Sequence, residues 1–139
     1  MRAVLDPVVF VRALINPQGR WGRLLFELSD RYTIVLSPEP IKEIVSVLYR
    51  PTLRRRFPRI GEPPRLDRVL AILEKAEVVE PDQKVSICRD PDDDKFFECG
   101  LEGRAAYVVS EDKDILAVGD YRGIRSITAS AFMALLEEE

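Results

Sequence analysis

The chain has 139 residues, of which 46% are hydrophobic and 32% are charged, and these values fit a single soluble globular domain with a real core. No apolar run approaches the roughly 20 residues of a membrane-spanning helix. Asp6 interrupts the first apolar stretch, so we expect neither a membrane span nor a signal peptide. The net charge of −3 argues against nonspecific electrostatic binding along nucleic acid. It does not argue against a local basic patch on the surface.

The first half of the chain alternates between short apolar strands and amphipathic helices. A strand expected at residues 2–5 runs into Asp6, and Pro7 favours a turn into a helix start. Helices are expected at residues 8–14, 21–28 and 38–49, and a second strand at residues 31–36. Glu43 lies at the border of the apolar face of the third helix, where a carboxylate needs a partner or a function.

Residues 50–68 are the most basic part of the chain and carry seven arginines. Pro58, Gly61, Pro63 and Pro64 break the segment into a short helix and a loop, so we interpret it as an insertion rather than a core element. Two interpretations of its arginines stay open. They form a solvated surface, or Arg54, Arg55 and Arg56 contact the phosphates of an RNA.

The second half is organised around an acidic stretch from Asp90 to Asp114. Four aspartates, at positions 90, 92, 93 and 94, precede a short helix that stops at Gly103, and an apolar strand at residues 105–109 then ends in further acids. The other expected elements are a helix at 66–76, a strand at 78–79, a strand at 124–127 and a last helix after Thr128. The acids at the helix start and at the strand end can meet at one sheet edge, where a divalent cation would relieve their repulsion.

The chain contains no histidine, which excludes Ser-His-Asp and Cys-His catalysis and imidazole-ligated zinc. Cys88 and Cys99 match no zinc spacing and are too few for a disulfide framework, which favours a cytoplasmic location. Hydrolysis would then need metal-activated water, or a carboxylate or lysine base. The aspartates favour the metal, because hard oxygen ligands suit Mg²⁺ or Mn²⁺.

The aspartates could also form a Ca²⁺-binding loop or cap the helix that follows them. An EF-hand loop that starts at Asp90 needs Gly and Glu where this chain has Lys95 and Leu101, so a Ca²⁺ loop is excluded. Asp92 and Asp93 are expected to cap the following helix. No Gly-rich segment follows a strand, so a phosphate-binding loop is not indicated.

The alternation of strands and helices predicts one α/β domain over residues 1–139, with a doubly wound parallel sheet and helices on both faces. A phosphotransfer receiver shares this pattern. It needs paired acids after the first strand and an aspartate after the third, where this chain has only Asp6 and then Glu80-Pro81. The receiver is therefore the last-ranked interpretation.

Four stretches resemble the PIN domain family, in the branch of VapC-like toxins from toxin–antitoxin pairs: VLDPVVFVRALI, SPEPIKEIVSVL, RDPDDDKFFECGL and AAYVVSEDKDIL. They occur in the family's order over most of the chain, with only residues 50–68 unmatched. The resemblance places the four acids of the family on Asp6, Glu43, Asp94 and Asp112, of which Asp6, Asp94 and Asp112 would hold metal. Asp94 is selected from its run because it directly precedes the helix.

The resemblance also implies a fold, an activity and partners. It implies a five-stranded sheet of order 3-2-1-4-5 and a Mg²⁺- or Mn²⁺-dependent ribonuclease, with an antitoxin protein as partner and a homodimeric assembly. Ser110 matches the family's hydroxyl residue, which orients the site, and Asp114 is a candidate fifth acid.

One departure from the family follows the first acid. The family usually has Asp-Thr-Asn where this chain has Asp6-Pro7-Val8, so the Asn that would hydrogen-bond to neighbouring carboxylates is missing. A metal-dependent ribonuclease is favoured because all four acids are present. The alternative is a PIN fold that no longer cuts and that binds RNA or a protein.

Overall fold

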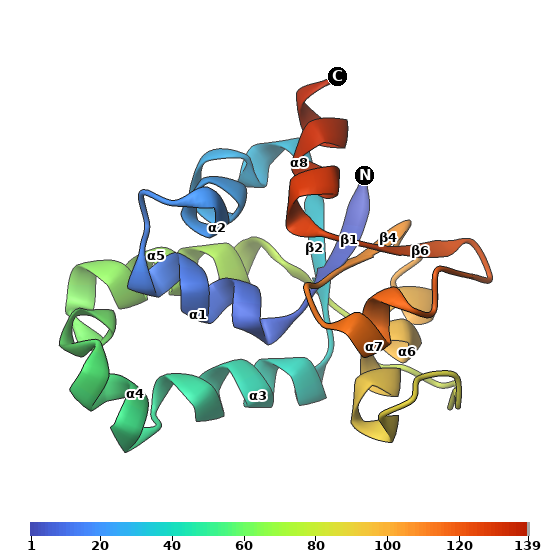
Figure 1. The fold of residues 1–139 in the computed structure, drawn as a ribbon, viewed down its shortest axis with the longest axis horizontal. Coiled ribbons are helices and arrows are strands. Elements are labelled where there is room, and N and C mark those ends of the chain that lie inside the picture. Colours follow the sequence, from blue (N-terminus) through green and yellow to red (C-terminus); the bar gives the residue numbers. More distant parts are fainter. Residues whose placement is uncertain (139) are drawn as a thin grey trace.

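The structure, a computed structural model, describes residues 1–138, which form a six-stranded sheet between two groups of helices (Figure 1). The strands are β1 (Arg2–Leu5), β2 (Thr33–Leu36), β3 (Glu77–Val78), β4 (Tyr107–Val109), β5 (Asp120–Tyr121) and β6 (Ile124–Ile127). Their order across the sheet is β3-β2-β1-β4-β6-β5, and every neighbouring pair is parallel except β5 with β6. The predicted α/β class with a mainly parallel sheet is therefore confirmed.

Most helices lie at the predicted positions, but the helix expected at residues 66–76 begins at Pro63, and the helix at Lys113–Leu116 was not expected. The helices are α1 (Pro7–Ile15), α2 (Arg20–Gly22), α3 (Pro38–Leu48), α4 (Pro51–Arg56), α5 (Pro63–Lys75), α6 (Asp94–Glu102), α7 (Lys113–Leu116) and α8 (Ala129–Glu137). The helix expected at residues 21–28 is instead α2 followed by a π-helical turn, η1 (Arg23–Glu27), and three short 3₁₀ turns are η2 (Ser29–Arg31), η3 (Pro58–Gly61) and η4 (Pro91–Asp93). None of the helices in residues 1–138 has the length and apolar character needed to cross a bilayer.

The central strands β1, β2 and β4 bury both of their faces, because successive side chains of a strand point to opposite sides of the sheet and helices cover both sides. Leu5 of β1 belongs to the larger core, which packs against α1, η1, α3, α5 and α8. Val4 belongs to the smaller core, which packs against α6 and α7. Figure 1 shows α1 and α5 on one side of the sheet and α6 and α7 on the other.

The predicted strand count and order need a correction at one edge. The turn expected at Gly119-Asp120 continues into β5, which pairs antiparallel with β6 and so adds a sixth strand outside the predicted fifth. Arg122 and Gly123 connect the two strands, and both have positive φ, at 49° and 87°. Two such residues give the tight turn that suits the twist of a hairpin.

The basic segment, which was expected to lie outside the core, contributes residues to it. Ile60, in η3, is only 1% exposed and belongs to the larger core, and Phe57 packs against that core. Nη1 of Arg65 donates hydrogen bonds to the carbonyl oxygens of Leu14 (2.6 Å) and Ile15 (3.4 Å) in the last turn of α1. These contacts satisfy carbonyl groups that a helix end leaves free.

Candidate active site

Asp6 is fixed where β1 passes into α1. Its backbone N–H donates a 3.0 Å hydrogen bond to the carbonyl of Val109, which keeps the ends of β1 and β4 together. Its Oδ1 accepts a 3.1 Å hydrogen bond from the N–H of Val8, so Asp6 is the N-cap of α1. The residue is only 8% exposed. Its carboxylate is therefore held in one place at the carboxyl edge of the sheet.

Ser110 joins Asp6 to Asp112 across the two strand ends. The Ser110 hydroxyl is fully buried and donates a 2.7 Å hydrogen bond to Oδ2 of Asp6. The same oxygen accepts a 3.0 Å hydrogen bond from the N–H of Asp112. Oδ1 of Asp112 then accepts a 2.8 Å hydrogen bond from the N–H of Asp114, so Asp112 is the N-cap of α7. This places Asp6, Ser110, Asp112 and Asp114 at one edge of the sheet.

The carboxylates at this edge repel one another. Burial raises the pKa of Asp6, and the charges of Glu43 and Asp112 raise it further, while the hydrogen bonds from Val8 and Ser110 act in the opposite direction. Because carboxylates that raise one another's pKa lie close together, a positive charge at this edge would stabilise the site.

Glu43, in α3, already has such a charge beside it. Nζ of Lys95 lies 2.5 Å from Oε2 of Glu43, so the two side chains form an ion pair. Oε2 is buried, and within residues 1–138 no other donor forms a hydrogen bond to it. Lys95 has no role among those predicted from the sequence. Its position directly after Asp94 in the first turn of α6 was the one available signal.

The structure gives the two adjacent aspartates Asp93 and Asp94 different surroundings. Oδ1 of Asp94 accepts hydrogen bonds from the N–H groups of Ile87 (3.1 Å) and Cys88 (2.8 Å), and the residue is 7% exposed. One oxygen of this predicted ligand therefore anchors the preceding loop. Whether Asp94 binds metal stays a prediction.

Asp93 was expected only to cap the helix, and this expectation is wrong. Its side chain makes no capping hydrogen bond to α6. Burial, followed by the charges of Asp112, Asp90 and Asp6, raises the pKa of Asp93 to about 6. Asp93 is therefore the aspartate of the acidic run whose carboxyl is coupled to both Asp6 and Asp112. In the preceding turn, Asp90 is the capping residue, since its Oδ1 accepts a 3.0 Å hydrogen bond from the N–H of Asp92.

The donor atoms at this edge fit a hard divalent cation. Carboxylate oxygens are what Mg²⁺ and Mn²⁺ prefer, and within the described chain Asp6, Asp93 and Asp112 form no ion pair with lysine or arginine. In residues 1–138, no three acidic side chains already surround one point. Asp6 is buried, whereas Asp93 is half-buried and Asp112 is exposed, so solvent and ions can reach the last two carboxylates.

A cavity of about 200 Å³ opens beside the acids. It is lined by Asp6, Val8, Val9, Arg12, Trp21, Glu111 and Asp112. Val8, where the family usually has Asn, is 46% exposed on its wall, and only the main chain of Val8 bonds to Asp6. The cavity is large enough to admit part of a nucleotide next to Asp6 and Asp112.

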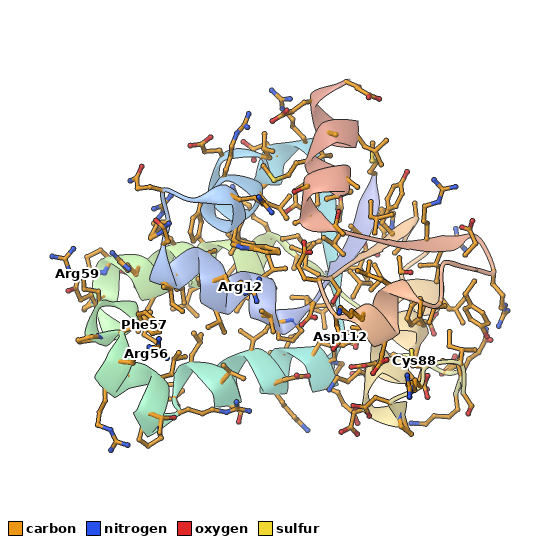
Figure 2. All side chains as sticks on the ribbon, viewed as in Figure 1. Arg12, Arg56, Phe57, Arg59, Cys88 and Asp112 are labelled. Atoms are coloured by element: carbon orange, nitrogen blue, oxygen red, sulfur yellow. The ribbon has the colours of Figure 1, made fainter. Side chains whose placement is uncertain are left out.

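The arginines predicted to contact RNA lie far from these acids. Nε of Arg54 donates a 2.8 Å hydrogen bond to the carbonyl of Leu48, and its guanidinium lies 4.6 Å from the centre of the Tyr49 ring. Arg54 therefore caps the end of α3. Figure 2 shows Arg56, in α4, well away from Asp112 near the middle of the molecule. An RNA contact by Arg55 and Arg56 stays a prediction.

Comparison with known proteins decides the family. A sequence model described as the PIN domain matches residues 2–114. The chain belongs to the PIN domain family. PIN domains are typically nucleases and usually bind divalent metals. The predicted family is thereby confirmed, while the toxin branch of it stays a prediction.

The chain is also similar to two other proteins. The uncharacterized protein MJ1680 of Methanocaldococcus jannaschii is 31% identical over 122 residues, which are 86% of this chain and 76% of that protein. The crystal structure of PAE2754 from Pyrobaculum aerophilum superposes with a TM-score of 0.60 over 100% of this chain and 91% of that chain. At 15% identity, the second comparison shows a shared fold alone.

Replacing Asp93 with asparagine is expected to stabilise the metal-free PIN domain near neutral pH. Folding raises the pKa of Asp93 from 3.8 to about 6, so the folded protein holds this proton more tightly than the unfolded chain. The resulting stability is complete below about pH 4 and is lost as the pH rises through about 6. In EDTA, Asp93→Asn should lose less stability over this range than the wild type, by roughly 1 kcal/mol after allowance for solvent screening. Asp92→Asn, an exposed neighbour, is the control, and superposable wild-type and Asp93→Asn curves would contradict the coupling.

Proposed function

We propose that this PIN domain is a Mg²⁺- or Mn²⁺-dependent ribonuclease that hydrolyses phosphodiesters of single-stranded RNA. The observation that carries the proposal is the Ser110 hydroxyl, which hydrogen-bonds to both strand ends and thereby sets the carboxylates of Asp6 and Asp112 beside one cavity. Membership of a family whose members are typically nucleases supports the same conclusion.

The proposal gives each acid a place. Asp6 and Asp112 hold the metal, and the third ligand comes from the adjacent pair Asp93 and Asp94. A bound Mg²⁺ or Mn²⁺ supplies an activated water and neutralises charge on the leaving oxygen. Ser110 holds the carboxylate of Asp6 in position, the role that hydrogen-bonding partners usually have around metal ligands. Glu43 lies at the edge of the site, where its pairing with Lys95 limits its negative charge.

The proposal predicts that metal changes both stability and activity. Millimolar Mn²⁺ should raise the melting temperature, because a ligand that binds only the folded state stabilises it by mass action. Purified protein should cut single-stranded RNA in Mn²⁺, and EDTA should stop the reaction. Asp112→Asn should reduce both effects, and comparing Asp93→Asn with Asp94→Asn should show which of the two supplies the third carboxylate. A wild-type melting temperature indifferent to Mn²⁺ would count against the site.

We also propose that the protein is the toxin of a toxin–antitoxin pair and that its partner is an antitoxin protein. In this proposal the chain forms a homodimer and acts in the cytoplasm. These points rest on the four sequence stretches that resemble the toxin branch. Light scattering of the purified chain measures its oligomeric state. Co-purification with the product of a neighbouring gene would identify an antitoxin.

A second candidate function is a PIN fold that binds RNA or a protein without cutting. Two observations favour it. Val8 presents an apolar side chain where an amide is usual, and Lys95 already pairs with Glu43, one of the four family acids. Binding without metal-dependent cleavage of any RNA pool would support this function over the first.

A further inference from the structure

A groove leads away from the acids along α1 towards α2. The cavity beside Asp6 and Asp112 adjoins a second hollow of about 430 Å³. The second hollow is lined by Arg12, Asn16, Gly19, Arg20, Trp21 and Glu111. Because the two hollows share Arg12, Trp21 and Glu111, they adjoin each other along α1, and we refer to them together as the groove. A strand of RNA with its reacting phosphate near Asp6 would have this groove beside it.

Arg12 and Trp21 form a flat, positively charged platform in the middle of the groove. The guanidinium of Arg12 lies 5.1 Å from the centre of the Trp21 ring. Figure 2 shows Arg12 on α1, between Asp112 and the distant Arg56. Bases of single-stranded RNA stack on aromatic rings and on guanidinium planes, and this contact tolerates any sequence because every base has a flat face.

The charges of the groove are available to phosphates. Arg12 and Arg20 are exposed, and neither forms an ion pair with any residue of the described chain. Arg23, in contrast, pairs with Glu137 at 2.5 Å. Glu111 is the acid in the groove, and its Oε1 accepts a 3.1 Å hydrogen bond from the N–H of Ala129 at the start of α8. The positive end of that helix offsets its charge.

We propose that this groove holds the nucleotides of single-stranded RNA that flank the cleaved phosphate. A base stacks on the Arg12–Trp21 platform, and Arg12 and Arg20 neutralise phosphates on either side of that base. The inference rests on the proposed ribonuclease function, because it names where that substrate lies. The carboxylates of the site alone would repel the phosphates of the substrate, and the positive charges of Arg12 and Arg20 reduce this repulsion.

The chain's own fluorescence tests the stacking contact directly. Trp21 is the one tryptophan of the 139 residues, so tryptophan emission reports on this groove alone. Titration with a short single-stranded oligouridylate should quench the emission in saturable fashion, in Mn²⁺ or in EDTA. A duplex RNA, whose bases are not free to stack, should quench it much less. A lack of quenching in both buffers would overturn the proposal.

Substitutions with a matched control test the charges. Arg12→Ser with Arg20→Ser should weaken oligouridylate binding by about 10-fold or more. It should also lower the slope of log affinity against log salt by about 1.4, at roughly 0.7 for each phosphate that is no longer neutralised. Arg55→Ser with Arg56→Ser removes the same charge from the exposed part of the basic segment and should leave both quantities nearly unchanged. If the control pair has the larger effect, the groove is not the path and the basic segment is.

Trp21 is tested by two replacements, because it is half-buried and packs against the core. Trp21→Leu should weaken binding by about 10-fold, within the range of roughly 1–3 kcal/mol for one base stacked on an aromatic ring, and Trp21→Phe should restore most of the affinity. Equal binding by all three proteins would contradict the platform. Cleavage is assayed separately, so quenching without cleavage would overturn the proposed function only, and cleavage without quenching would overturn the groove only.

Discussion

Replacing Asp6 with alanine is expected to abolish metal-dependent cleavage of RNA. The carboxylate of Asp6 is the one that both Ser110 and the start of α1 hold in place, so its loss removes a ligand for which the fold offers no substitute. We expect the rate to fall by more than about 100-fold, since loss of a ligand should exceed the roughly 10–100-fold that its hydrogen-bonding partners are typically worth. The measurement is single-turnover cleavage of a labelled RNA in Mn²⁺.

The Asp6→Asn variant separates loss of charge from loss of structure. Asparagine is as good an N-cap as aspartate, and it removes the repulsion with Glu43 and Asp112. Its melting temperature in EDTA should therefore equal or exceed that of the wild type, while its cleavage should be lost. Undiminished cleavage by Asp6→Ala would mean a contaminating nuclease or chemistry elsewhere, and the site assignment would have to be withdrawn.

Replacing Ile60 with alanine is expected to destabilise the protein by roughly 2–5 kcal/mol, the usual cost of emptying a well-packed core position. Ile60 is 1% exposed within the larger core, although it comes from the segment that was interpreted from its sequence as an insertion. Urea unfolding followed by circular dichroism measures the change. Its neighbour Arg59, which is exposed, is the control, and Arg59→Ala should change stability by less than about 0.5 kcal/mol. Equal stabilities of the two variants would restore the insertion interpretation.

The main architecture could be predicted because the central strands β1, β2 and β4 are apolar on both faces and the strands alternate with helices. The side chains of Leu5 and Val4 point to opposite faces of the sheet, and each is buried by the helices that cover its face. The hairpin at the edge could not be predicted in the same way. It depends on Arg122 adopting positive φ, which is unusual for arginine, and a two-residue strand carries almost no periodic signal.

The sequence predicted the site residues whose positions follow from the ends of the strands. It did not predict which of two adjacent aspartates points its side chain towards the site. Asp6 and Asp112 follow adjacent parallel strands, so their proximity follows from the topology. Asp93 ends the 3₁₀ turn η4 and Asp94 begins α6, and successive residues of such helices are rotated by roughly 100–120° from one another. A difference of one position therefore sends one carboxylate to the loop at Cys88 and leaves the other coupled to Asp6.

The hydrogen bonds from Arg65 to the last turn of α1 connect distant parts of the molecule. Asp6 caps the first turn of the same helix, so side-chain hydrogen bonds hold α1 at both of its ends. We therefore expect a shift of the C-terminal end of α1 to shift the carboxylate of Asp6 as well. Substitutions among the core-facing residues of the basic segment can therefore alter the reaction rate without touching substrate, and a search for functional positions based only on distance from Asp6 would miss them.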